Sequence, residues 1–221
     1  MARRIRIKVF TDKFPLLGPL IYVLCLQYLV VQPIVAAAWP QTYNWSSNLI
    51  SDLGNTACGQ YSGRYVCSPD HAGMNASFIM LGLTMAIGSL LIYQEFRKNR
   101  GSHVGFSLMG LAGVGTVLVG LFPENVNSFG HGLGAFFGLL VGNLSMMILA
   151  LAIRQARNGF RLYTFLSGLL STLAFVLFMT KINFGLGQGG MERFVSYPQT
   201  LWLTLFGLYM SATRVRARMH K

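Results

Sequence analysis

The chain has 221 residues, of which 53% are hydrophobic and only 11% are charged, and its formal net charge is +12. Soluble domains usually have about 25% charged residues, so this composition excludes an ordinary soluble domain and indicates a membrane protein. The basic excess does not indicate a nucleic-acid partner, because neither interleaved exposed aromatic residues nor a basic face on a soluble element accompanies it.

Apolar runs of about 20 residues recur along the chain, and this is the length that a helix needs to cross the hydrocarbon core of a bilayer. We therefore predict an all-α fold, a polytopic bundle of six transmembrane helices that forms a single integral membrane domain over residues 1–221. In chain order, the expected spans are 14–38, 74–96, 106–121, 129–153, 163–182 and 196–213. The third is the shortest, and a re-entrant or strongly tilted segment is the alternative for it.

The positions of the basic residues predict how these spans are oriented. Fifteen of the 18 lysines and arginines precede the first span, follow the last, or lie between the second and third or the fourth and fifth. Only Arg64, Lys181 and Arg193 lie on the other side. Because basic residues favour the cytoplasmic side, both termini are expected to be cytoplasmic, in the plasma (inner) membrane. Membrane lipids, anionic ones included, are the expected partners.

The longest segment between spans runs from about Trp39 to Gly73 and is expected to be an extracytoplasmic loop. It contains Cys58 and Cys67, which we predict to form a disulfide because that side of the membrane is oxidising. Such a bond would stabilise the loop by about 2–3 kcal/mol. A metal site on the two thiolates is the alternative, although no second CxxC or CxxH set accompanies them.

Glycines and polar residues predict how the later spans pack. The fourth span carries Gly130, Gly134, Gly138 and Gly142, each four residues apart and therefore on one ridge of the helix. Such ridges let a neighbouring helix approach closely in a membrane. Polar residues of the second, fifth and sixth spans also recur at helical spacing along one side of each helix, and they become more frequent toward the outer ends. They predict either hydrogen bonds between helices or a cavity that opens to the outside.

Ionisable residues gather on the predicted outer side, where they escape the cost of full burial. The set comprises Asp52, His71, Glu124 and His131, which we expect to converge at the outer mouth of the bundle, and Lys181, Glu192 and Arg193, which we expect to supply counter-charges. Ionisable groups near a membrane usually pair with one another or serve function.

Three chemistries fit this cluster. In a catalytic site, Asp52, His71 and His131 would take protons as general bases. In a metal site, which would be zinc, the same three residues and Glu124 would be the ligands. In a binding site for a phosphate or carboxylate, the lining would comprise Ser51, Asn75, Glu124, Lys181, Glu192 and Arg193. A purely structural ion-pair network is the alternative, since the chain has no HExxH, GxSxG or HxxxH motif.

Five short segments in order carry a resemblance to a known family: "NLISDLGNTACG", "HAGMNASFIMLG", "LFPEN", "HGLGAFFGLLVGN" and "GGMERFVSYPQTLW". Together they resemble a bacterial membrane family defined by domain of unknown function nine-nine-eight, over nearly the whole chain. The resemblance implies a six-helix integral membrane protein and brings no established activity.

Two further comparisons bear on lipids. The segment from Ile50 to Gly54 is similar to the "ISD-x-G" segment of the eukaryotic Frag and DRAM-like membrane proteins, which include a factor for lipid remodelling of glycosylphosphatidylinositol anchors. That similarity favours a lipid-related role. The ceramidase-like membrane hydrolases end with a paired-histidine helix, whereas the last span here has no histidine.

The sequence therefore favours a protein that binds or handles a lipid head group or a small anion in a polar pocket at the outer face. One alternative is a membrane hydrolase or transferase acting on lipid. Another is a small-solute transporter, which would need polar residues toward the cytoplasmic side, where Asn143, Ser89 and Ser211 are the main examples. No cofactor is expected outside the zinc alternative.

Overall fold

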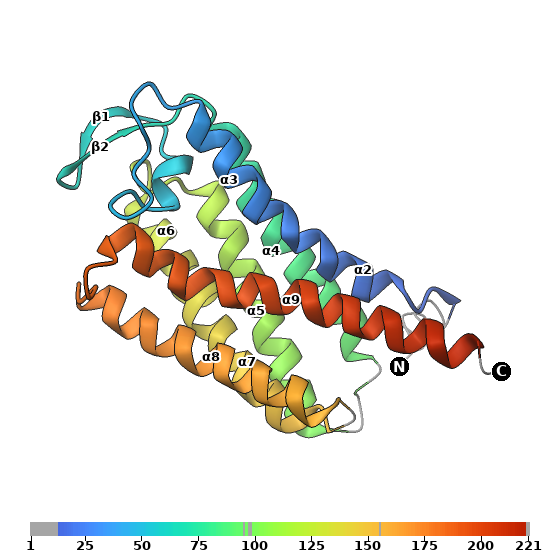
Figure 1. Cartoon of the computed structure of the whole chain (residues 1–221). Coiled ribbons are helices and arrows are strands. Elements are labelled where there is room, and N and C mark those ends of the chain that lie inside the picture. Colours follow the sequence, from blue (N-terminus) through green and yellow to red (C-terminus); the bar gives the residue numbers. More distant parts are fainter. Residues whose placement is uncertain (1–12, 95, 97–98, 155, 220–221) are drawn as a thin grey trace.

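The computed structural model describes residues 13–94, 96, 99–154 and 156–219 (Figure 1). Several predicted cytoplasmic cations lie outside the described residues, namely Arg3, Arg4, Arg6, Lys8, Arg97, Lys98 and Lys221. The described chain forms a bundle of long helices with a small capping lobe at one end, where the strands lie.

Helices account for most of the described chain. The first helical stretch comprises α2 (Leu17–Val23), η1 (Leu24–Leu26) and α3 (Gln27–Ala37), followed by α4 (His71–Tyr93) and α5 (Arg100–Leu121). The next comprises α6 (Ser128–Ala135), the π-helical turn η3 (Phe136–Val141) and α7 (Gly142–Ala152), followed by α8 (Asn158–Met179) and α9 (Gly187–Met219).

Five of these stretches are long and apolar enough to cross a membrane, which confirms the helical membrane class. They are Leu17–Ala37, His71–Tyr93, Arg100–Leu121, Ser128–Ala152 and Asn158–Met179. The last helix, α9, is longer, with 33 residues, but carries more polar and charged side chains. Its middle is nevertheless buried, since Trp202 and Leu203 have no exposed surface.

The third stretch differs from its predicted bounds. It begins at Arg100 rather than residue 106, so α5 has 22 residues and is a full-length helix rather than a short or re-entrant segment. Asn99 explains the early start, because its side chain accepts hydrogen bonds from the amides of Gly101 and Ser102 and so caps the helix. Its amide also donates to the carbonyl of Ala152.

Glycines set the spacing between α4 and α5. A Cβ atom built on Gly113 would lie 2.5 Å from the carbonyl oxygen of Gly82, so the two backbones touch there. The predicted glycine ridge is also used for packing. Gly134 faces α5, where a Cβ would lie 2.7 Å from the carbonyl oxygen of Gly115, while Gly142 makes room for the side chain of Gln199 on α9.

We predict that Gly113→Ala destabilises the protein by about 1–3 kcal/mol, because the methyl group forces two helix backbones apart. Gly110→Ala on the same helix is the matched control, since its nearest neighbour would be Ser89 at 3.9 Å. The control should be neutral or slightly stabilising, because alanine favours helix more than glycine does. Thermal unfolding in one detergent measures both. Equal effects would show that backbone contact does not limit this interface.

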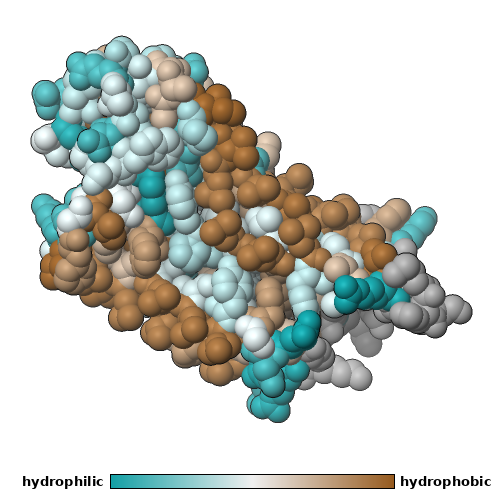
Figure 2. Space-filling view, in the orientation of Figure 1, coloured by the Kyte–Doolittle hydropathy of each residue, from teal (hydrophilic) through white to brown (hydrophobic). Residues whose placement is uncertain are grey.

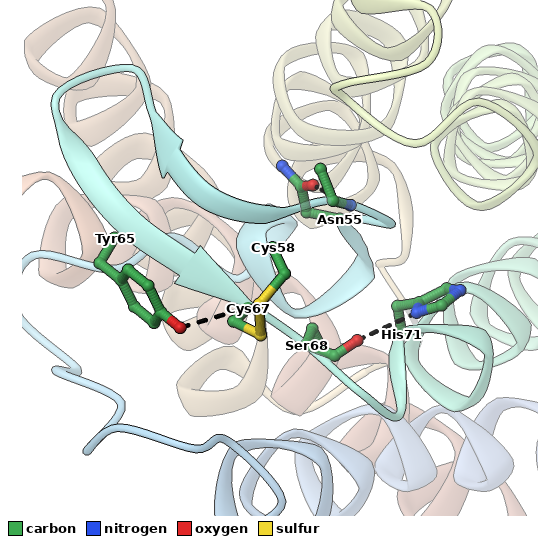
Figure 3. The surroundings of a disulfide bond; sticks show 7 residues. Asn55, Cys58, Tyr65, Cys67, Ser68 and His71 are labelled. Atoms are coloured by element: carbon green, nitrogen blue, oxygen red, sulfur yellow. Dashed lines mark hydrogen bonds between the residues drawn. A yellow bond between two sulfur atoms is a disulfide. The ribbon is translucent and has the colours of Figure 1, made fainter.

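The segment between α3 and α4, residues 38–70, forms the lobe. It contains the 3₁₀ turn η2 (Ser51–Gly54) and a hairpin of β1 (Cys58–Tyr61) with β2 (Arg64–Cys67), so the fold is not purely helical. Ser62 and Gly63 form the two-residue turn, and both have positive φ, which a type I′ hairpin turn requires at its two central residues. The predicted disulfide between Cys58 and Cys67 is present and joins opposite residues of the hairpin (Figure 3).

We call this end of the bundle the hairpin end; it comprises residues 38–70, 122–127 and 180–186. Figure 2 shows that its lobe is hydrophilic, whereas hydrophobic side chains cover long stretches of the helices beside it. Toward the opposite end, aromatic rings fill the interior: Trp202 stacks on Phe206, and Phe160 stacks on Tyr209. The buried acidic and basic residues of the described chain thus lie near the hairpin end, namely Asp52, Glu124, His131, Glu192 and Arg193.

Candidate functional site

Asp52 lies at the centre of the lobe and is fully buried. Its carboxylate pairs with Arg64 through both oxygens, at 2.5 Å from Nη2 and 2.6 Å from Nε. The backbone amide of Leu49 and the side chain of Asn48 also donate to it. Paired geometry of this kind orients both side chains firmly. Asp52 therefore fastens the hairpin to η2, and its oxygens are already engaged.

Arg193 makes the corresponding connection from α9. Its Nη1 donates to the carbonyl oxygens of Trp45 and Asn48 at 3.0 Å and of Gly189 at 2.7 Å. Its Nη2 donates to the hydroxyl of Tyr43. The guanidinium also lies over the Trp45 ring, 4.8 Å from its centre. Arg193 thus holds the lobe against α9 rather than facing an external anion.

Ser51, on η2, contacts two ionisable groups that lie far from it in sequence. Its Oγ lies 3.0 Å from Nε2 of His131 on α6 and 3.0 Å from Oε1 of Glu192 on α9. The other imidazole nitrogen, Nδ1, lies 2.9 Å from the carbonyl oxygen of Phe122. The other oxygen of Glu192 accepts from the backbone amide of Ile50. All three side chains are more than nine-tenths buried.

Hydrogen-bond roles in this row follow from counting protons. A carbonyl oxygen only accepts, so Nδ1 of His131 carries a hydrogen and donates to Phe122. The row of Nε2, Oγ and Oε1 needs two protons for its two hydrogen bonds, and the Ser51 hydroxyl supplies one. With the Ser51 hydroxyl donating to Glu192, the second hydrogen bond forms only when a further proton resides on His131 or on Glu192.

Glu124 stands next to this row, in the connection between α5 and α6. Its Oε1 accepts from Asn55 at 3.1 Å, and Arg64 lies 4.0 Å from its other oxygen. Burial, and after it the negative charge of Asp52, together raise the pKa of Glu124 to about 8. At neutral pH this carboxyl group is therefore mostly protonated and can donate a hydrogen bond.

We predict that ionising Glu124 destabilises the fold at alkaline pH. The folded protein keeps this proton up to about pH 8, whereas the ordinary value is 4.5. Stability is therefore full below about pH 4.5 and falls as pH rises toward 8, because the unfolded chain then releases a proton that the folded chain retains. Glu124→Gln lacks this penalty. Its gain in melting temperature over the wild type should grow between pH 5 and pH 8 and level off above it. A gain that is constant with pH would contradict the assignment.

A groove of about 540 Å³ opens between α6, α8 and α9 near the hairpin end. Its polar lining residues are Ser51, Glu124, Ser128, His131 and Glu192. Its walls are apolar and include Phe129, Leu133, Phe136, Phe175, Phe178 and Met179. We call it the hairpin-end groove. The hydrogen-bonded row of Ser51, His131 and Glu192 thus forms part of its wall.

A second, much smaller cavity of about 50 Å³ lies in the interior and shares Ser51 and Glu192 with the groove. Its lining also includes Ser196 and Gln199. The Oγ of Ser196 and the Oε1 of Gln199 are buried there without a hydrogen-bond partner in the described protein. A cavity needs only about 10–15 Å³ of such volume per water, so this one can hold a few waters that satisfy both atoms.

The structure brings some of the four expected ionisable residues together, but not all of them. Glu124 and His131 line the hairpin-end groove, whereas Asp52 is held by Arg64 and His71 is not in the lining. His71 lies at the start of α4, with Nδ1 3.0 Å from the carbonyl oxygen of Ser68 (Figure 3). Asp52 nevertheless stays near Glu124, because Arg64 contacts both carboxyl groups, whereas His71 is held at the start of α4.

Two predicted binding residues also lie elsewhere. Asn75 donates to the carbonyl oxygen of Gly54 and so supports η2 from α4. Lys181 is exposed beyond the end of α8, at a positive φ of 61°. In the part of the chain that the structure describes, no group of three or more His, Cys, Asp or Glu side chains could hold a metal ion. The proposed zinc set of His71, His131, Asp52 and Glu124 is therefore not assembled.

The sequence predicted Ser51 and Glu192 as binding residues but did not predict that Ser51 contacts both His131 and Glu192. The partners are separated by 80 and 141 residues, and no short motif joins them. The visible signal was the enrichment of polar residues at the outer ends of the spans.

Comparison with known proteins gives a family and no activity. No curated protein and no solved structure matches the chain. A family model described as "Protein of unknown function (DUF998)" matches residues 21–209, which is most of the chain and includes α4 to α8, the lobe and the hairpin-end groove. The chain therefore belongs to the DUF998 family of proteins of unknown function.

Proposed function

We propose that the protein crosses the plasma (inner) membrane six times, with α9 as the sixth span, both termini in the cytoplasm and the hairpin end outside. The described arginines of the opposite end support this orientation, namely Arg100, Arg154, Arg157, Arg161, Arg214 and Arg216. The long α9 packs along α2 and α8, which are themselves apolar enough to be within the bilayer. A disulfide in the lobe suits an oxidising compartment.

Within this orientation, the hairpin-end groove binds the chain of an amphiphile from the outer leaflet. The observation that carries the proposal is the groove itself, because apolar walls lead to a polar end in one cavity. Its volume is within the range of about 300–1,000 Å³ that is typical of small-molecule sites. Phe129 and Met179 in its wall are 79% and 63% exposed, so the groove faces the surroundings of the helices rather than the interior.

The polar end favours a head group that donates hydrogen bonds, such as a hydroxyl or an amine. Two carboxyl groups, those of Glu124 and Glu192, line the groove, whereas none of the lysines and arginines that the structure describes is in its lining. Arg64 and Arg193 donate instead to Asp52 and to backbone carbonyls. The geometry thus gives less support to a phosphate or a small anion than the sequence did.

A groove-filling substitution tests this proposal. Gly132 lines the groove and a Cβ built there meets no heavy atom within 4 Å, so the backbone has room for a side chain, and Gly132→Phe places a phenyl ring at the groove. Gly159→Phe is the matched control, because Gly159 is equally open and lines a groove between α8 and α9 near the opposite end.

The probe is a pyrene-labelled long-chain alcohol, added to protein in lipid nanodiscs. We expect Gly132→Phe to weaken its binding at least about 10-fold, which corresponds to about 1.4 kcal/mol, and Gly159→Phe to leave it unchanged. Equal binding by the wild type and both variants would overturn the proposal.

The transporter alternative has less support from the interior. Ser89 is hydrogen-bonded to Tyr22, and Asn143 donates to the carbonyl oxygen of Val195. These polar groups therefore form hydrogen bonds between helices. Aromatic rings around Phe206 fill the space toward the cytoplasmic end.

A further inference from the structure

We propose that Ser51 is a nucleophile that attacks the ester carbonyl of an acyl lipid in the hairpin-end groove, with His131 as its general base. This inference rests on the proposed function, because the groove must first bind the acyl chain. It assigns a reaction class, ester cleavage or acyl transfer, to a site whose residues otherwise only hold α6, α9 and η2 together.

The contact between Ser51 and His131 has the geometry that such chemistry needs. Serine is a weak nucleophile until a base within about 2.6–3.2 Å takes its proton, and a third group usually orients that base. Here Nε2 of His131 lies 3.0 Å from Oγ, and the Phe122 carbonyl fixes the ring by accepting from Nδ1. In the neutral ring, this contact leaves Nε2 as the acceptor facing the hydroxyl.

The protonation state of Glu192 determines the direction in which the Ser51 hydroxyl donates its hydrogen bond. When Glu192 carries the second proton of the row, it donates to Oγ of Ser51, and the serine hydroxyl then donates to His131. The backbone amide of Ile50 holds the other carboxyl oxygen in place. Glu192 is therefore a positioning residue, and its protonated form is the one that prepares Ser51 for attack.

The reaction proceeds in two balanced steps. In the first, Oγ of Ser51 bonds to the ester carbonyl carbon and its proton moves to Nε2 of His131. The carbon–oxygen bond to the alcohol then breaks, the alcohol oxygen takes that proton from His131, and the acyl chain remains on Ser51. In the second, water gives a proton to His131, attacks the acyl carbon and releases a fatty acid, while Ser51 recovers its proton.

Two features on either side of Ser51 support these steps. In the groove, His131 lies in the lining together with Ser51, so an ester carbonyl bound there can reach both side chains. In the interior, the 50 Å³ cavity also touches Ser51, and the unpartnered Gln199 Oε1 and Ser196 Oγ in its lining are suited to hold water. The interior cavity thus hydrates one side of Ser51, whereas the water that gives its proton to His131 comes from the groove, whose lining includes His131.

A long-chain alkyl fluorophosphonate tests the nucleophile on the intact protein in nanodiscs. Its phosphorus bonds to the serine oxygen, fluoride leaves, and the serine proton passes to the base. We expect mass spectrometry to locate the label on Ser51 and to find none there in Ser51→Ala. His131→Gln should slow labelling at least about 100-fold, since general bases usually contribute that much or more. Ser47→Ala, an exposed serine of the same segment, should label like the wild type.

Binding of the pyrene-labelled alcohol, measured on the same samples, separates this inference from the proposed function. If the wild type and His131→Gln bind the alcohol but Ser51 of the wild type is not labelled, Ser51 is not a nucleophile and only the binding proposal stands. If labelling of Ser51 is equally fast in His131→Gln, the assigned base is wrong. If the wild type does not bind the alcohol, the proposed function fails first.

Discussion

Replacing Arg64 with methionine is expected to lower the free energy of unfolding by about 3–5 kcal/mol, the usual cost of removing one partner of a buried ion pair. The reason is asymmetric burial. Asp52 has no exposed side-chain surface, whereas 19% of the Arg64 side chain is exposed. Losing Arg64 therefore leaves a buried carboxylate without its counter-charge and detaches the hairpin from η2.

A double variant distinguishes this cause from loss of packing. Asp52→Asn combined with Arg64→Met removes both charges, so it should be markedly more stable than Arg64→Met alone. Arg154→Met, which changes an exposed arginine near the opposite end, is the control and should alter stability by less than about 0.5 kcal/mol. Chemical unfolding followed by tryptophan fluorescence measures all three. A double variant no more stable than the single one would contradict the ion-pair explanation.

Replacing Arg193 with methionine is expected to release the lobe from α9. Hydrogen bonds from a charged group contribute about 1.5–3 kcal/mol each, and this guanidinium donates to three carbonyl oxygens and to Tyr43. We therefore expect a loss of about 3 kcal/mol or more, concentrated where the lobe meets α9. Hydrogen exchange of the amides of residues 44–49 should accelerate about 100-fold or more, since every 1.4 kcal/mol is a factor of ten.

Lys181→Met is the control for Arg193, because it removes a positive charge from an exposed position in the neighbouring connection. Its exchange pattern should match that of the wild type. Should Arg193→Met leave residues 44–49 protected, other contacts such as those of Glu192 with Ser51 and Ile50 hold the lobe to α9, and the role assigned to Arg193 would be wrong.

The long helices could be predicted because hydrophobic runs of membrane length dominate this chain. The stripe of Phe78, Gly82, Met85 and Ser89 on α4 does face the interior, as its helical spacing indicates. The start of α5 could not be predicted, because the first turn of this helix is polar and resembles a loop. The hydrogen bonds by which Asn99 caps that turn depend on local geometry. The hairpin was missed because its four-residue strands are short and contain few of the usual apolar residues.

The site could be located but not assembled from the sequence. Topology alone brings Ser51, His131 and Glu192 to one end of the bundle. Which carboxyl groups face a cavity depends on which of them pairs with a cation. Arg64 forms its close ion pair with Asp52, and Glu124, 4.0 Å from Arg64, lines the groove. Such choices between partners far apart in the chain are decided by packing, and no residue spacing records them.

The most direct test of the account is photo-crosslinking of the protein in nanodiscs with a long-chain alcohol that carries a diazirine on its alkyl chain. We predict that the labelled residues are concentrated in the wall of the hairpin-end groove, at Phe136, Phe175, Phe178 and Met179, and that Gly132→Phe removes these labels. Labels spread evenly over exposed apolar residues of other helices, such as Leu20, Ile34 and Leu83, and unchanged in Gly132→Phe, would contradict the account.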